Sequence, residues 1–336
     1  MKRILFLSGI FCMSLNLTLA QQVRYKVKID DPMDFKNFML HIDPIMADCY
    51  LTNITFGVAA RADYMVNKVF DLSAQIRKPY FDLNEVALRD DAENTSSNGV
   101  YGKNGIKPMS FMEGTFQLHF LDKIKATNHR IVFFKSTSTS GNYQTTTTKY
   151  VDIPGHVRKV KSLRGGAIWM NTSVDFSNSF GVENEYKFTN KNNNADTFGF
   201  AGGTMMRSVI VYAGLSGQSI ANFKVLTDKY GMKYATPWTS LYADFMFAPV
   251  LNFADVISNK TNAEYNVENI QIKRTGWRVG YVIRNHKGTS WSMAFNFGAR
   301  PGIVGEKGIT TSRAFFDMNL GISLPYNLSL KSKKKD

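Results

Sequence analysis

The chain of 336 residues carries 41 lysines and arginines against 27 acidic residues, a formal net charge of +14. Its length allows one large domain or two of ordinary size. Of the two cysteines, Cys12 lies in the export signal predicted below, so Cys49 alone remains and excludes an intramolecular disulfide. A basic surplus of this size favours acidic partners, of which nucleic acid and anionic lipid head groups are the usual examples.

The first 20 residues have the features of a cleaved export signal. Residues 2–3 are Lys and Arg, residues 4–17 are mostly apolar, and the small residues Thr18 and Ala20 precede the predicted cleavage point. The stretch is short for a retained membrane anchor, which needs about 20 apolar residues. Because an exported protein does not meet nucleic acid, the basic surplus then predicts outer-membrane lipid and lipopolysaccharide as partners. Lysines that only keep loops solvated are the alternative.

Beyond residue 20 the dominant pattern is an alternation of apolar and polar residues with period two. Between Phe111 and Leu121 the apolar set is Met112, Gly114, Phe116, Leu118 and Phe120, and the polar set is Glu113, Thr115, Gln117 and His119. The same division recurs in residues 70–77, 168–176, 277–284, 291–300 and 314–324. Because alternate side chains of a strand point to opposite faces, each segment predicts a β-strand with one apolar and one polar face.

Less regular strand candidates raise the expected total to about 12 strands, in a range of roughly 10 to 14. They span residues 52–61, 129–134, 182–189, 204–214, 220–227 and 241–252. The connections are expected to alternate between short ones, such as residues 122–128, and longer polar ones, such as residues 136–144. Tight turns on one side and long loops on the other are typical of a transmembrane β-barrel.

The predicted architecture is all-β, a closed antiparallel transmembrane β-barrel formed by residues 51–328. A spanning strand finds no water for its backbone N–H and C=O groups, so the sheet has to close on itself. Residues 21–50 are expected to form an N-terminal periplasmic or plug-like segment, or alternatively one more strand and a linker, and residues 329–336 a basic C-terminal tail. A soluble secreted β-sandwich that binds a glycan or a surface ligand would also alternate, and remains open.

Three features resemble the outer-membrane barrel proteins of Bacteroidota-like bacteria. They are the exported segment of residues 1–20, the sequence Arg-Gly-Gly-Ala-Ile-Trp at residues 164–169, and Phe-Gly-Ala-Arg-Pro-Gly-Ile at residues 297–303. The resemblance implies a β-barrel in the bacterial outer membrane. One departure concerns the last strand, because such barrels usually finish in an aromatic residue that the assembly machinery recognises. This chain instead continues past Tyr326 into a lysine-rich tail.

No motif for catalysis, for a cofactor or for a metal is found. None of the five histidines lies in a nucleophile elbow or in a paired-histidine metal motif. We therefore expect a protein that is not an enzyme and holds no cofactor. A lipid-modifying barrel enzyme is the alternative, because His119 shares the polar side of its strand with Glu113 and Gln117.

Two groups of residues are candidates for functional contacts. A basic stretch is predicted to bind lipopolysaccharide phosphate or other anions through charge-assisted hydrogen bonds, and consists of Arg158, Lys159, Lys161 and Arg164. By alternation the barrel lumen is predicted to contain Glu113, Gln117, His119, Arg278, Arg284 and Arg300. The predicted function is an outer-membrane barrel that is either a small-solute pore or a structural or accessory subunit of an envelope complex, with envelope proteins as partners.

Overall fold

The computed structural model describes residues 24–50, 53–82, 94–97, 100–103, 107–141, 143–175, 187–199, 203–258, 261–267, 272–304 and 313–328. They form two compact units, each described by itself: unit 1 comprises residues 24–33, 126–157 and 221–235, and unit 2 comprises the remainder. The predicted export signal and the predicted basic tail lie outside the described residues. Within the described ranges no helix has the length and apolar character needed to cross a membrane.

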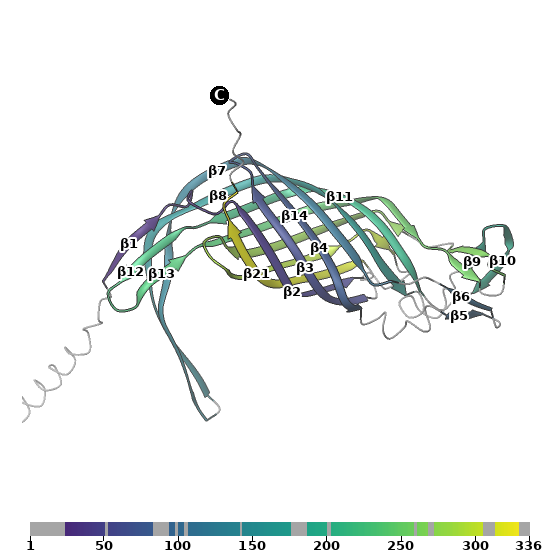
Figure 1. The fold of residues 1–336 in the computed structure, drawn as a ribbon, viewed down its shortest axis with the longest axis horizontal. Coiled ribbons are helices and arrows are strands. Elements are labelled where there is room, and N and C mark those ends of the chain that lie inside the picture. The colour runs from purple at the N-terminus through teal and green to yellow at the C-terminus, as the bar shows by residue number, and fades with distance from the viewer. Residues whose placement is uncertain are drawn as a thin grey trace, which may run out of the picture. The chain divides into compact units, whose positions relative to one another are not determined.

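Ten antiparallel strands of unit 2 form a closed ring in the order β2–β3–β4–β7–β8–β11–β14–β18–β19–β21 (Figure 1). Their bounds are β2 (Phe38–Tyr50), β3 (Asn53–Met65), β4 (Phe70–Asp82), β7 (Ser110–Ser140), β8 (Tyr143–Asp175), β11 (Gly203–Ile220), β14 (Pro237–Phe253), β18 (Thr275–Asn285), β19 (Ser290–Ala299) and β21 (Ala314–Tyr326). The first and last strands close the ring, with Phe38 opposite Tyr326. The predicted all-β antiparallel architecture is confirmed, and a closed ring leaves no free sheet edge, unlike a sandwich.

The connections at one end of the ring form two smaller sheets. The larger has the order β10 (Asn193–Gly199), β9 (Lys187–Asn190), β16 (Glu264–Val267), β15 (Val256–Ser258), β6 (Val100–Lys103) and β5 (Asn94–Ser97). The smaller pairs β17 (Ile272–Lys273) with β20 (Gly302–Ile303). At the opposite end the connections 66–69 and 286–289 are short. Long and short connections thus lie mostly at opposite ends of the ring. The exceptions are residues 51–52, which join β2 to β3 at the long end, and residues 221–236, which join β11 to β14 at the short end.

Unit 1 has two layers of β-structure. One is a sheet in which β12 (Phe223–Thr227) lies between β1 (Tyr25–Asp30) and β13 (Gly231–Ala235). The other consists of residues 126–140 of β7 and 143–157 of β8, which we call the hairpin arm. The layers are held together by a hydrophobic cluster of Ile131, Phe133, Ile153, Phe223 and Val225.

The ring has ten strands, which lies at the lower end of the expected range of 10 to 14 and below its central value of about 12. Three of the strand candidates lie outside the ring. Residues 129–134 continue β7 into the hairpin arm, residues 220–227 run from the end of β11 into β12, and residues 187–189 belong to β9 in a connection. The ring gains β2 instead, so it begins at Phe38 and the predicted boundary at residue 51 is wrong.

Two predicted connections are also corrected. Residues 122–128, expected as a tight turn, lie within β7. Residues 136–144 were expected as a loop, and those described, 136–141 and 143–144, form the end of the hairpin arm. The hydroxyls of Thr137 and Thr146 hydrogen-bond across the arm at 3.3 Å. Both stretches are polar because they are exposed strand, and polarity alone does not separate an exposed strand from a loop.

Candidate functional site in the interior of the ring

The ring has a polar inner face and an apolar outer face over much of its circumference. On β7, Glu113 and Gln117 are buried, whereas Met112 and Phe116 on the opposite face are each about half exposed. The sequence alternation therefore gave the correct division of side chains on this strand. The same division holds on β19 and β21, where Asn296 and Asp317 point inward.

Two arginines and two aspartates form a closed cycle of ion pairs inside the ring. Arg300 donates to both oxygens of Asp48, at 2.8 and 2.9 Å, and to Asp317 at 3.0 Å. Arg77 donates to the same two carboxylates, at 2.8 Å to Asp48 and 2.9 Å to Asp317. Because each charge has two opposite partners, the desolvation of these buried groups is offset within the cycle.

A second cycle, of two arginines, one aspartate and one glutamate, lies beside the first. Arg278 donates to Asp244 at 2.7 Å and to Glu113 at 2.8 Å. Arg164 lies 3.2 Å from Asp244 and 3.5 Å from Glu113. The guanidinium of Arg164 also stacks 3.7 Å above the ring of Tyr242. Four strands, β7, β8, β14 and β18, are thereby tied together through the interior.

Tyr242, on which Arg164 of the second cycle stacks, connects the two cycles. The Tyr242 hydroxyl donates to Oδ1 of Asn296 at 2.5 Å, and Nδ2 of Asn296 donates to Asp317 at 2.8 Å. The interior thus holds one continuous polar network. Buried polar groups that are connected in this way favour a single arrangement of the strands around them.

Toward the end of the ring with short connections, further pairs extend the network. Arg61 donates to Asp43 at 2.7 Å, and Arg284 lies 3.4 Å from Asp63. In this interior network, as far as the structure describes it, six arginines thus pair with six carboxylates, namely Arg61, Arg77, Arg164, Arg278, Arg284 and Arg300 with Asp43, Asp48, Asp63, Glu113, Asp244 and Asp317. Balanced charge leaves little net field to attract ions of one sign.

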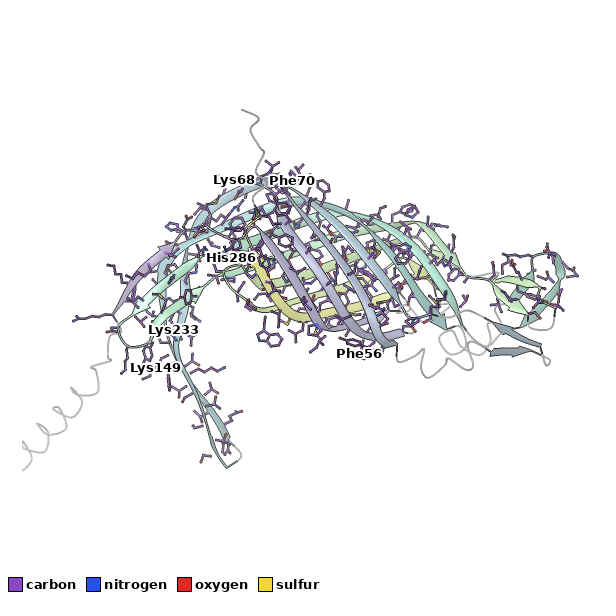
Figure 2. The ribbon with its side chains drawn as sticks, viewed as in Figure 1. Phe56, Lys68, Phe70, Lys149, Lys233 and His286 are labelled. Atoms are coloured by element: carbon purple, nitrogen blue, oxygen red, sulfur yellow. The ribbon has the colours of Figure 1, made fainter. Side chains whose placement is uncertain are left out.

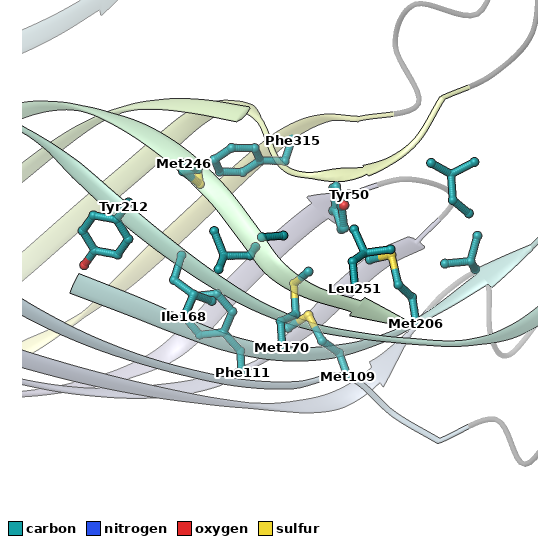
Figure 3. Packing of buried hydrophobic residues seen from close by; sticks show 14 of the residues in the cluster. Tyr50, Met109, Phe111, Ile168, Met170, Met206, Tyr212, Met246, Leu251 and Phe315 are labelled. Carbon is teal, nitrogen blue, oxygen red and sulfur yellow. The ribbon is translucent and has the colours of Figure 1, made fainter. Parts of the chain in front are cut away.

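The other end of the interior is filled by apolar side chains, which we call the apolar plug (Figure 3). It comprises chiefly Met46, Phe111, Ile168, Met170, Met206, Ile210, Met246, Leu251 and Phe315, each at most 4% exposed. The apolar set of residues 168–176, of which 168–175 are described, was expected to face outward. Instead Ile168 and Met170 point into the plug, and Trp169 points out.

A small cavity remains between the plug and the short-connection end. Its volume is about 60 Å³, and its lining includes Arg61, Asp63, Gln75, Arg164, Tyr242 and Arg284. Such a space holds only a few water molecules. Nε2 of Gln75 has no hydrogen-bond partner within the protein, which suits a water molecule there.

All six residues predicted to line the lumen have side chains directed into the ring. Glu113, Arg278 and Arg300 belong to the ion-pair cycles, and Arg284 stacks 4.2 Å above Trp238. Gln117 accepts from Ser216 at 2.5 Å. His119 contacts Asp71 at 3.0 Å and the Lys68 carbonyl at 3.0 Å.

The basic stretch of β8 does not form one contact surface, which corrects that prediction. Arg158 is buried and donates to Asp122 at 2.7 and 2.8 Å, and Arg164 belongs to the second cycle. Lys159 and Lys161 point outward from the same strand. The physical reason is the period of two, since neighbouring side chains along a strand face opposite sides. Contact of Lys159 and Lys161 with phosphate stays a prediction.

The described residues include no group of three histidine, cysteine or acidic side chains arranged to hold a metal ion. The contacts of His119 are a carboxylate and a backbone carbonyl, which orient its ring. Its role in catalysis, and the expectation that the protein is not an enzyme, both stay predictions.

Sequence reasoning missed several acids of the network, above all Asp43 and Asp48 on β2. The register of β2 against β21 shifts between Ile42 and Ile45. Inward positions therefore change from odd to even, with His41 and Asp43 buried before the shift and Asp48 buried after it. A bulge of this kind erases the two-residue period that identifies a strand.

Comparisons with known proteins give little further information. No protein-family model matches the chain, and no curated protein matches it. Among solved structures, one match is OmpT (in-vitro folded), an outer membrane protein of Vibrio cholerae, with 8% identity and a TM-score of 0.18 over 90% of this chain and 100% of that chain. A match this distant assigns no family and offers nothing specific to Bacteroidota.

Proposed function

We propose that the chain is an outer-membrane β-barrel with a closed interior, which serves as a structural or accessory subunit of an envelope complex. The observation that carries the proposal is the inverted distribution of its side chains. Paired charged residues occupy much of the inside of the ring beside the apolar plug, while large apolar residues cover the outside. The outer set includes Ile42, Leu72, Ile76, Met112, Phe116, Leu215, Leu241, Phe245, Trp277, Trp291, Phe297 and Ile322.

This distribution is costly in water and favourable in a bilayer. Leaving one large apolar side chain in water, rather than burying it, costs about 1.5–3 kcal/mol. A soluble monomer rarely exposes a continuous apolar band of this kind. A lipid environment removes the cost, and ring closure satisfies the backbone groups that face lipid.

Strand lengths and aromatic residues fit the same environment. β2, β3, β4 and β21 each have 13 residues, and β18 and β19 have 11 and 10. A tilted strand needs about 9–11 residues to cross the hydrocarbon core. Phe70 and Phe56 lie near opposite ends of the ring wall (Figure 2).

Aromatic clusters at both ends resemble the girdles that transmembrane barrels place at the two membrane interfaces. At the end where β2 starts, the Phe38 ring lies 6.2 Å from Tyr64 and 6.4 Å from Tyr326. Toward the other end, the rings of Trp277 and Phe297 meet edge to face at 6.2 Å.

The contents of the interior favour a closed barrel over a small-solute pore. A water-filled channel needs a continuous polar passage. Here the apolar plug occupies one part of the interior and the paired arginines occupy another. A barrel of ten strands can be filled by its own side chains.

The experiment combines fractionation of the cell envelope with conductance measurements in planar bilayers. The native protein should co-fractionate with the outer membrane and migrate differently on gels before and after heating in detergent. In planar bilayers the purified protein should give no channel steps. The combined variant Met170→Ala, Met206→Ala and Met246→Ala, which shortens three side chains of the plug, should leak and so show that the assay detects an opening. Channel steps from the unchanged protein would overturn the closed-barrel proposal.

A further inference from the structure

The hairpin arm of unit 1 carries apolar residues on both of its faces, although the fold covers only one. The run Ile131, Val132, Phe133 and Phe134 has no polar residue. An uninterrupted apolar run is typical of a strand that is buried on both sides. Ile131 and Phe133 are 3% and 7% exposed because they pack on β12.

The opposite face of the arm is uncovered. Val132 is 44% exposed, Phe134 42% and Tyr150 51%. Together these residues form what we call the open face. Three large apolar side chains on neighbouring strands are a cluster of the kind that marks an interaction site, in contrast to scattered single residues.

Cations border the open face. Arg130 lies 4.3 Å above the Tyr150 ring, and the ammonium group of Lys149 lies 6.0 Å from the centre of the Phe134 ring. Asp152 is already engaged by Arg130, through hydrogen bonds of 2.9 and 3.1 Å. The border is therefore positive overall.

The same sign holds for the whole of unit 1. Its described residues contain nine cationic side chains and four acidic ones, a net charge of +5 with histidine neutral. The cations are Arg24, Lys26, Lys28, Arg130, Lys135, Lys149, Lys224, Lys229 and Lys233, and the acids are Asp30, Asp31, Asp152 and Asp228. A two-fold contact between copies places each surface against itself, so a second copy would meet like charge.

We propose that the open face is the docking surface for another envelope protein, one that offers an apolar patch with an acidic rim. The inference rests on the proposed accessory role and names the kind of partner that this role requires. The apolar centre supplies contact area, and the lysine and arginine border selects a partner of opposite charge.

The test places a photoreactive benzophenone amino acid at position 134 of the full-length protein in living cells. Illumination should give one discrete adduct with a protein of acidic surface. The same group at position 234 is the matched control, because Tyr234 is also an exposed aromatic residue of unit 1 but lies on β13. Position 234 should give little or none of that adduct.

A charge exchange then tests the complementarity. The variant Lys149→Glu should lower the adduct yield by about tenfold. Once the adduct is identified, changing carboxylates at its cross-linked surface to lysine should restore the yield. An adduct with a second copy, an adduct with lipid alone, or no adduct would overturn the proposal, as would equal yields from positions 134 and 234.

Heat-dependent migration on gels is recorded for the same variants. It separates the docking-surface proposal from the proposed outer-membrane function. A barrel that is intact in the membrane but gives no protein adduct contradicts the docking surface alone. A chain absent from the membrane contradicts the proposed function, whatever the cross-linking shows.

Discussion

Arg278 on β18 donates a 2.8 Å hydrogen bond to Glu113 on β7, four strands away around the ring. Contacts between neighbouring strands only reinforce the sheet, whereas this contact crosses the interior. It fixes the separation of two distant walls. The interior of the barrel therefore takes part in holding its shape, as a core does in a soluble protein.

Removal of the Glu113 carboxylate should destabilise the barrel strongly. Glu113→Ala takes an acceptor from Arg278, Arg164 and Tyr212, and leaves Asp244 to balance two buried guanidinium groups. We expect a loss of about 3–5 kcal/mol in the free energy of unfolding, measured by denaturant titration of the refolded protein in lipid. Met112→Ala, on the adjacent outward position, should cost clearly less. Equal effects would mean that the network is not a source of stability.

A methyl group added inside the ring should be tolerated poorly, because the interior is full. A Cβ at Gly280 would lie within 2.5 Å of atoms of Tyr242 and Asn296. Gly280→Ala should therefore destabilise by about 1–3 kcal/mol in the same titration. Gly217→Ala is the control, since nothing lies within 4 Å of the added atom. A wide, water-filled lumen would instead tolerate both changes.

A charge on the outer face distinguishes a bilayer from water. Ile76 is 53% exposed and lies near the middle of β4. Ile76→Lys should destabilise the inserted protein by about 2–4 kcal/mol, because a cation at mid-membrane depth loses its hydration. Ile76→Leu should be close to neutral. If this face met water, the lysine would be harmless and would improve solubility.

One side-chain amide joins the residue before β2 to a residue that follows β21. Nδ2 of Asn37 donates to the Leu328 carbonyl and Oδ1 accepts from the Leu328 amide, both at 2.9 Å. Asn37→Ala should lower the midpoint temperature of heat-modified migration, with a loss of roughly 1–2 kcal/mol for the two hydrogen bonds. Asn37→Asp keeps only the acceptor, so its midpoint temperature should lie between those of the unchanged protein and Asn37→Ala. No change in either variant would mean that β21 needs no tie beyond its strand pairing.

Much of the ring could be predicted from the sequence wherever the inside is polar and the strand is regular. Residues 111–120 and 314–324 belong to this class, and their inward and outward sides were assigned correctly. Arg278 and Arg300 were placed inside by the same argument. Their partners could not be named, because Glu113 and Asp48 reach them only through closure of the ring.

The failures have two physical causes. The bulge in β2 interrupts alternation near Pro44, which hid both the strand and its inward aspartates. In β8, apolar residues occupy both faces around Trp169, so the pattern does not say which set points in. The structure places Ile168 and Met170 inside because the plug needs apolar volume there.

The most direct test of the central claim is fluorescence quenching by lipids brominated on their acyl chains. The chain has four tryptophans, of which Trp169, Trp277 and Trp291 are 43%, 50% and 68% exposed and Trp238 is 1% exposed. Four variants that each retain one tryptophan are reconstituted in brominated bilayers. We predict strong quenching of the three outward residues and almost none of Trp238. Equal quenching of all four, or none of any, would contradict a membrane-spanning ring with a closed interior.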